Sequence, residues 1–75
     1  MRPEINSLYK HYKGNVYRVV CIARHSEDLS ELVVYSDASV PEKIWARPLE
    51  MWSETVEVNG VSVERFKKIG EGDNI

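Results

Sequence analysis

The sequence has few of the residues that mark a secreted, membrane-bound or disulfide-stabilised protein. It holds one cysteine, Cys21, which excludes an internal disulfide and favours the reducing cytoplasm. No apolar run approaches the ~18 residues that a membrane span needs. The opening Met1–Glu4 leads into no apolar signal-peptide core. We therefore expect a cytoplasmic protein without a membrane segment.

Groupings of reactive side chains are also scarce. His11, Cys21 and His25 have none of the short spacings that closed zinc sites use. There is no glycine-rich phosphate loop, because the glycines that could serve stand in predicted turns. The consecutive side chains of His25–Glu27 would alternate between the faces of a strand, so they cannot form a nucleophile–base relay. We expect no catalytic residue, no metal and no cofactor, and a small enzyme or an accessory to an enzyme remains an alternative only.

Size and composition indicate one domain with a modest core. The chain has 75 residues, of which 43% are hydrophobic and 29% are charged, with a net charge of −2. Residues 1–25 carry five basic residues and one acidic residue, and this basic third also holds Tyr9, Tyr12 and Tyr17. Such a segment could attract a phosphate-bearing partner, unless the fold mixes it in space with the acidic remainder.

The pair Asn59-Gly60 is the clearest local signal, because it is the preferred sequence of a two-residue type I′ turn. It predicts a hairpin with four valines on one face. These are Val56, Val58, Val61 and Val63. The alternation breaks after this hairpin. Either a bulge near Arg65 returns Phe66 to the core, or Arg65 lies opposite Glu54 and Phe66 covers a separate edge.

A second hairpin is predicted around Gly14-Asn15, because glycine tolerates the positive φ of a tight turn. A two-residue loop there places Tyr12 opposite Tyr17 in the core and Tyr9 opposite Val20, partly exposed. One face of the second strand then forms a buried stripe. That stripe consists of Tyr17, Val19, Cys21 and Ala23.

Three further elements are predicted between the hairpins. Glu31–Ser36 is typical of an interior strand, and Ile44–Arg47 of another. Pro48 favours the start of a helical turn that brings Leu49 and Trp52 onto the core. Five to six short strands with one helical turn predict an all-β fold, a small antiparallel barrel. We assign residues 1–7 to an N-terminal extension, 8–69 to the barrel and 70–75 to a disordered tail.

Six blocks of the sequence together resemble one bacterial and phage family, known only as domain of unknown function 1653. In order they are Tyr9–Tyr17, Ala23–Glu27, Leu32–Tyr35, Trp45–Met51, Val56–Gly60 and Arg65-Phe66. The similarity extends from about Leu8 to Ile69. It implies an SH3-like barrel of the cytoplasm and no established activity. The sequence departs from the family pattern at Ser36–Lys43, where the family usually has a shorter turn, and at Trp52, where it usually has phenylalanine.

The best candidates for a site are groups suited to binding. If Ile44 and Ala46 face the core, Trp45 and Arg47 project outward together, and an indole beside a guanidinium suits a planar or anionic ligand. The candidate ligand-binding residues are Arg24, His25, Trp45 and Arg47. The alternative is that Trp45 shields a barrel edge while an acidic residue, Glu31 or Glu50, neutralises Arg47.

We therefore expect a non-catalytic binding module that recognises a peptide or protein segment, as grooves of SH3-like barrels do. Nucleic-acid or nucleotide binding through the basic N-terminal hairpin is the alternative. That second site would comprise Tyr9, Lys10, Lys13 and Arg18. The sequence leaves the oligomeric state open.

Overall fold

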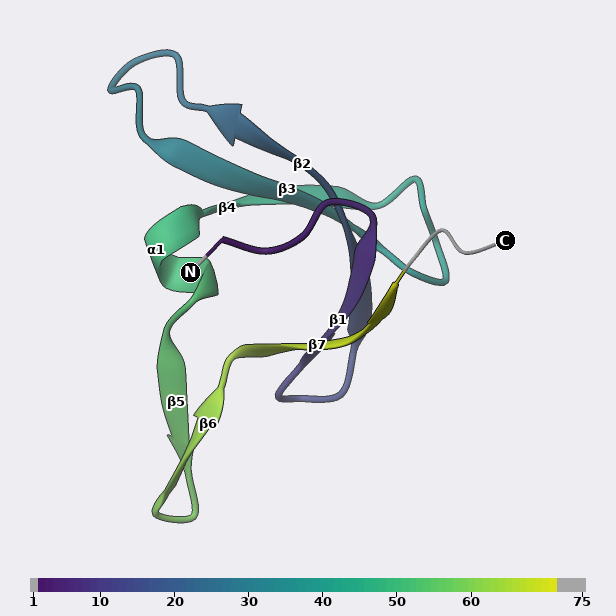
Figure 1. Ribbon diagram of the computed structural model, residues 1–75, viewed down its shortest axis with the longest axis vertical. Helices are drawn as coiled ribbons and strands as arrows, with labels where there is room; N and C mark the ends of the chain where they lie inside the picture. Colours follow the sequence, from purple (N-terminus) through teal and green to yellow (C-terminus); the bar gives the residue numbers. More distant parts are fainter. Residues whose placement is uncertain (1, 72–75) are drawn as a thin grey trace.

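The computed structural model describes residues 2–71 as seven strands and one short helix (Figure 1). The elements are β1 (Ser7–His11), β2 (Val16–Arg24), β3 (Glu31–Asp37), β4 (Ile44–Pro48), α1 (Leu49–Trp52), β5 (Thr55–Val58), β6 (Val61–Glu64) and β7 (Phe66–Glu71). The all-β expectation is confirmed. The additional strand is β7, which includes Gly70 and Glu71, two residues that we had assigned to the tail. The remainder of that predicted tail lies outside the described residues.

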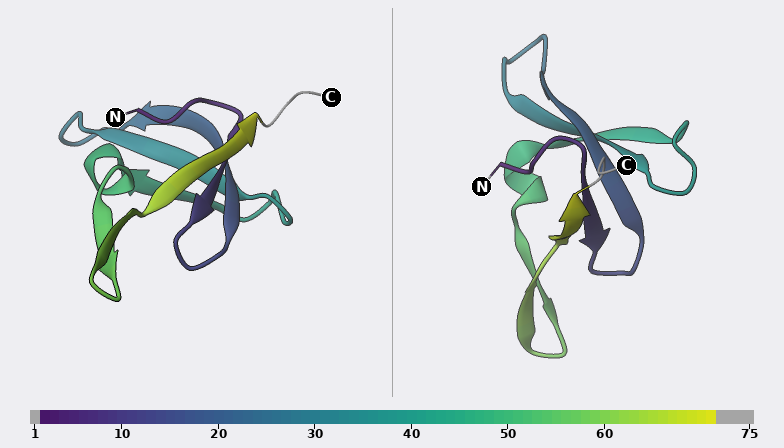
Figure 2. Two further views of the ribbon diagram at one scale, coloured as in Figure 1. Left: turned by 60° about the horizontal axis from the view of Figure 1, so that its bottom comes forward. Right: turned by 45° about the vertical axis from the view of Figure 1, so that its right-hand side comes forward.

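The strands form two antiparallel units. Five of them make a sheet in the order β4-β3-β2-β1-β7, and β5 pairs only with β6. Within residues 2–71 the sheet does not close on itself, so the closed barrel that we expected is not found. Strands β4 and β7 remain as its two edges, and the chain passes from one edge to the other through α1 and the β5–β6 hairpin (Figure 2).

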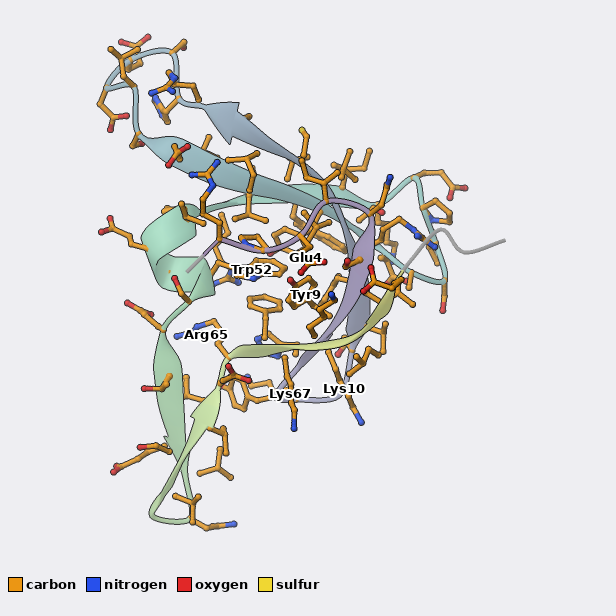
Figure 3. The ribbon with its side chains drawn as sticks, viewed as in Figure 1. Glu4, Tyr9, Lys10, Trp52, Arg65 and Lys67 are labelled. Atoms are coloured by element: carbon orange, nitrogen blue, oxygen red, sulfur yellow. The ribbon has the colours of Figure 1, made fainter. Side chains whose placement is uncertain are left out.

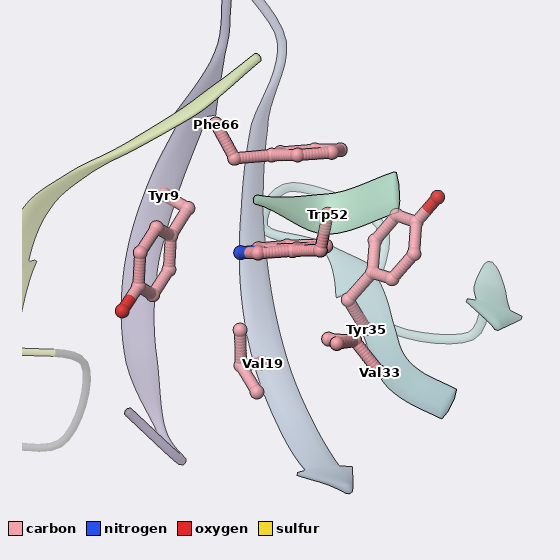
Figure 4. Packing of buried hydrophobic residues seen from close by; sticks show 6 residues of the cluster. All are labelled: Tyr9, Val19, Val33, Tyr35, Trp52 and Phe66. Atoms are coloured by element: carbon pink, nitrogen blue, oxygen red, sulfur yellow. The ribbon is translucent and has the colours of Figure 1, made fainter. Parts of the chain in front are cut away.

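The core lies on one face of the five-stranded sheet and is mainly aromatic (Figure 4). Its buried residues are Tyr9, Val19, Val33, Tyr35, Trp52 and Phe66. The Trp52 and Phe66 rings stack in parallel with their centres 3.7 Å apart. The predicted helical turn is thus confirmed, because α1 brings Trp52 onto the core and Leu49 packs against it. No helix in the described part of the chain is long and apolar enough to cross a membrane.

The turn between β1 and β2 has three residues rather than two. Gly14, with φ of 112°, donates its backbone N–H to the carbonyl of His11 at 2.7 Å. The N–H of His11 in turn donates to the carbonyl of Asn15 at 2.8 Å. This is the pattern of a tight turn followed by a glycine bulge, which shifts the register from that of a two-residue loop.

The shifted register exchanges two tyrosines. Tyr9, not Tyr12, lies opposite Tyr17, so Tyr9 is buried and Tyr12 is 39% exposed. The buried stripe predicted for the second strand is right for Tyr17 and Val19 and wrong from Cys21 onward, because the β2–β3 ladder slips by one residue between Val19 and Cys21. Beyond this bulge Ile22 packs against the core. Cys21 is turned to the opposite face and is half-buried.

The β5–β6 hairpin has the predicted turn and register. Asn59 and Gly60 both have positive φ, 52° and 80°, and Val58 lies opposite Val61. The strand alternation then breaks at Arg65, as expected, and both alternatives hold in part. The Arg65 side chain pairs with Glu54, with Nη2 3.2 Å from Oε1, while Phe66 still enters the core.

Candidate functional site

The four predicted site residues lie in two separate places. Arg24 ends β2, and its guanidinium donates to the carbonyl of Leu29 in the β2–β3 loop at 3.1 Å. His25 lies in that loop, where its Nδ1 accepts the backbone N–H of Glu27 at 3.0 Å. Both side chains are therefore engaged in holding their own loop, which projects from the sheet (Figure 1). Trp45 and Arg47 lie on β4, on the far side of β3.

Strand β4 faces the opposite way from our expectation. Trp45 lies opposite Tyr35 and Arg47 opposite Val33, and both partners belong to the core. Because side chains directly opposite in a ladder share a face, Trp45 and Arg47 lie on the core-bearing face of the sheet. The residues left exposed on the other face are Ile44 and Ala46. The two candidates are together, as predicted, but on the inner face, where aromatic partners are available.

Trp45 extends the aromatic core to the edge of the sheet. Its ring stacks on Tyr35 with the centres 5.9 Å apart, and meets Tyr17 edge-on at 5.6 Å. The indole nevertheless keeps 42% of its surface exposed. It is thus oriented by two rings and still accessible to a ligand.

Arg47 has aromatic partners and no acidic one. Its Nε donates to the Tyr35 hydroxyl at 3.4 Å, and its guanidinium carbon lies 5.5 Å from the centre of the Phe66 ring. Within residues 2–71 no carboxylate lies within ion-pair distance of it. The neutralisation of Arg47 by Glu31 or Glu50, which was the alternative to a binding site, is therefore not found among these residues.

Two further basic groups belong to this region. The His11 ring contacts Phe66 edge-on at 4.9 Å, and burial, helped by the positive charges of Arg47 and Arg65, lowers the pKa of His11. Arg65 uses Nη2 for Glu54, but its Nε is buried and has no hydrogen-bond partner in the part of the chain that the structure describes. We call this group the cationic aromatic cluster. It consists of His11, Tyr17, Trp45, Arg47 and Arg65.

Sequence reasoning missed three members of this cluster. Tyr17 was predicted as a core residue and not as part of a site. Arg65 was signalled only by the break in alternation after the second hairpin. His11 depended on the length of the first turn: with a three-residue loop, β1 ends at His11 opposite Phe66, and the imidazole enters the cluster. The predicted two-residue loop gave no reason to place it there.

The alternative nucleic-acid site is dispersed by the fold. Tyr9 is buried in the core, and Lys13 lies in the β1–β2 turn. Lys10 follows the buried Tyr9 in its strand, and Arg18 follows Tyr17, which lies opposite Tyr9. Because neighbouring side chains in a strand point to opposite faces, Lys10 and Arg18 lie on the face of the sheet away from the core. Lys10 is also directly opposite Lys67 of β7, and the two side chains point outward together in Figure 3.

A pocket of about 400 Å³ opens beside β7. We call it the slot. Its walls are residues 2–4 of the N-terminal segment on one side and 66–68 of β7 on the other, with residues 53–55 after α1 at one end. Tyr9, Trp52 and Phe66, which lie together in Figure 4, supply aromatic surface at its floor. The slot therefore gives access to the otherwise buried aromatic core.

The backbone of β7 is unpaired along one side. Tyr12 donates its N–H to the carbonyl of Arg65 at 2.9 Å, which fixes the alternation of the β1–β7 ladder. By that alternation the N–H and C=O groups of Phe66 and Lys68 point away from β1. Among residues 2–71 they have no backbone partner on that side. Both residues line the slot, so a free strand edge borders its aromatic floor.

The charges around the slot are mixed in sign. Lys68 joins Glu4 at 2.7 Å to Glu71 at 2.8 Å, and these hydrogen bonds raise the pKa of the Lys68 ammonium. Lys67 and Glu64 also line the slot, and neither forms an ion pair within the described residues. A strongly basic surface of the kind that follows a phosphate backbone is therefore absent from the slot.

A second and more open pocket, of about 550 Å³, lies between β1, β7 and the β5–β6 hairpin. It is lined by His11 and Tyr12 on one side and by Val58 and Val63 on the other. Its volume is larger than that of the slot, but it is closer to a flat surface, so it confines a ligand less. No group of three or more His, Cys, Asp or Glu residues that could hold a metal ion occurs in residues 2–71.

Comparison with known proteins places the chain in a family. The sequence model of the protein family of unknown function DUF1653 matches residues 7–68. The chain belongs to this family. A crystal structure of a DUF1653 protein from Bordetella bronchiseptica is similar to it, with 33% sequence identity and a TM-score of 0.77. The match covers 95% of this chain and 90% of that chain. No curated protein matches. Membership in DUF1653 confirms the resemblance seen in the sequence and brings no activity or partner with it.

Proposed function

We propose that this DUF1653 chain is a non-catalytic binding module that takes up an extended peptide segment in the slot. The observation that carries the proposal is the free edge of β7 beside the aromatic floor. A peptide that adds a strand to a sheet edge gains main-chain hydrogen bonds from that edge and specificity from pockets for alternate side chains. The slot offers both in one place.

The contacts of a bound segment follow from the geometry. Its backbone would pair with the outward N–H and C=O groups of Phe66 and Lys68. Every second side chain would then face the Tyr9, Trp52 and Phe66 rings, so an apolar or aromatic side chain is preferred there. The unpaired Lys67 and Glu64 lie at the rim, where charge influences selectivity more than affinity.

We also propose that the open sheet, with α1 and the β5–β6 hairpin across its unclosed side, is an opened form of the SH3-like barrel. In such a form the slot lies where the closing strand pair would be, which leaves the edge of β7 available. We place the protein in the cytoplasm, for which the single unpaired cysteine is the supporting observation.

The experiment separates the strand edge from the side chains around it. A displayed library of random short peptides is panned against the protein, and a recovered peptide is titrated while amide shifts are followed by NMR. We expect shifts at Phe66–Lys68, and slowed hydrogen exchange of the Phe66 and Lys68 amides in the complex. Binding that shifts only amides remote from β7 would contradict the proposal.

Substitutions at Lys68 provide a matched pair. Lys68→Pro removes the outward N–H without removing a β1–β7 hydrogen bond, so it should abolish peptide binding. Lys68→Ala loses the same side chain and its ion pairs but keeps the N–H, so it should retain binding. Equal affinity of the two variants would rule out strand addition, and sedimentation of the free protein shows whether a second copy already occupies the edge.

A further inference from the structure

The cationic aromatic cluster has donor capacity that the described part of the chain leaves unused. Arg47 has one weak hydrogen bond to a hydroxyl and no carboxylate, and the Arg65 Nε is buried without an acceptor. A buried donor without a partner lowers the stability of the folded state. Because this Nε is closed to solvent, Arg65 offers a ligand its positive charge, while Arg47 offers hydrogen-bond donors.

Positive charge exceeds negative charge around these donors. The Arg47 guanidinium and the His11 ring both lie against Phe66, and Arg65 is its neighbour in the chain, so these basic groups meet at one ring. In agreement with this, the pKa of His11 is lowered by burial and then by the charges of Arg47, Arg65 and Lys13. Two acidic groups interact with members of the cluster: Glu54 is held by Arg65, and the charge of Asp37 adds to the effect of burial in raising the pKa of Tyr17. Neither acid pairs with Arg47. An anion therefore gains favourable contacts here that the chain does not already provide.

A planar surface lies beside this positive charge. Trp45 and Arg47 are two residues apart on one face of β4, which separates their Cα atoms by about 6.5 Å. The exposed part of the Trp45 indole can stack with a flat ring, since Tyr35 and Tyr17 hold it in place. A guanidinium at that spacing can donate two parallel hydrogen bonds to a phosphate that belongs to the same ligand as the stacked ring.

We propose that the cationic aromatic cluster binds a nucleotide, with the base on Trp45 and the phosphate between Arg47 and Arg65. The base–phosphate unit can come from a free mononucleotide or from a single strand, since both present the same chemistry. This site is distinct from the slot: neither Trp45 nor Arg47 lines it. It also differs from the predicted basic hairpin, whose Lys10 and Arg18 lie on the other face of the sheet.

The test uses the fluorescence of Trp45. The chain has two tryptophans, so Trp52→Phe leaves Trp45 as the only indole. Phenylalanine keeps an aromatic ring against Phe66, and circular dichroism checks the fold of this background. Adenosine 5′-monophosphate, adenosine, inorganic phosphate and a short single-stranded oligonucleotide are titrated separately. We expect saturable quenching by the mononucleotide, and adenosine should bind at least about tenfold more weakly because it lacks the phosphate.

Variants locate the site. Arg47→Gln should weaken mononucleotide binding by at least tenfold, and Arg47→Lys should recover only part of it, because lysine lacks the planar pair of donors. Arg24→Gln removes an arginine that lies outside the cluster and is more exposed than Arg47, and it should leave binding unchanged. Lys68→Pro should also leave it unchanged, which keeps this result independent of the peptide experiment.

Each remaining outcome is decisive. Binding of the oligonucleotide alone, lost in Arg47→Gln, assigns the site to a strand rather than to a free nucleotide and supports the proposal. Equal affinity for adenosine and its monophosphate overturns it, because the phosphate would then make no contact. Equal losses in Arg24→Gln and Arg47→Gln overturn it as well, as does the absence of quenching by any of the four compounds.

Discussion

The two antiparallel units of this chain treat their valines in opposite ways. In the five-stranded sheet Val19 and Val33 are fully buried, because four aromatic side chains cover that face. In the β5–β6 hairpin Val61 is 60% exposed, although the hairpin has the same strand pattern and an ideal turn. The hairpin extends beyond the sheet (Figure 1), and of its four valines Val58 and Val61 are exposed while Val56 and Val63 are half-buried.

The difference shows that pattern and burial are separate properties. Alternation and a favourable turn specify which residues share a face, but a face is buried only where another element lies over it. In the sheet, α1 and β7 bring Trp52 and Phe66 over the strands. In the hairpin, the valine face borders only the more open pocket, through Val58 and Val63.

The largest effect is expected from a substitution in the buried core of the five-stranded sheet. Phe66→Ala removes a ring that stacks on Trp52 and contacts Tyr35, so it should lower the free energy of unfolding by about 3–5 kcal/mol. Val61→Ala in the hairpin should change it by no more than about 0.5 kcal/mol. Urea unfolding followed by circular dichroism measures both, and comparable losses would show that the hairpin is covered in solution.

A smaller effect is expected at the hairpin turn. Gly60 has φ of 80°, a region that costs a β-branched residue roughly 1–2 kcal/mol, so Gly60→Val should destabilise the hairpin by about that amount. Because the hairpin projects, the loss should appear first as faster hydrogen exchange at Val58 and Val61. Gly60→Asn, which tolerates positive φ better, is the matched control. Unchanged exchange in Gly60→Val would show that the turn differs in solution.

Much of the fold could be predicted because it depends on local patterns. The Asn59-Gly60 hairpin, the interior strand now seen as β3 and the helical turn that carries Trp52 all follow from turn chemistry and alternation. The first hairpin could not be predicted as well, because Gly14 is compatible with a two-residue and with a three-residue turn. The choice between the two turns decides to which face of the sheet each side chain of β1 points.

The candidate site was harder to predict because it depends on non-local contacts. The position of the bulge after Val19 and the face to which each β4 side chain points depend on which side chains fit the aromatic core. The sequence of one strand does not contain that information. Trp45 and Arg47 were correctly placed together because they alternate on one strand. The slot forms because residues 2–4 lie beside β7, and no sequence motif predicts that contact.

The smallest effect concerns the charge balance at His11. Its pKa is lowered in the folded protein, first by burial and then by Arg47 and Arg65, so the folded state binds fewer protons than the unfolded state near pH 6.5. The stabilisation that His11 gives as a neutral group is therefore complete above pH 6.5 and declines as the pH falls below that value.

An NMR titration of the imidazole should give a midpoint below 6.5, and Arg47→Gln should raise it part of the way back. A bound phosphate should raise it in the wild-type protein, because an anion stabilises the imidazolium form. A midpoint at 6.5 that neither Arg47→Gln nor adenosine monophosphate changes would show that the positive charges of the cluster do not converge on His11. The core-bearing face of β4 would then carry no local excess of positive charge, and in this respect it would not differ from the valine face of the hairpin.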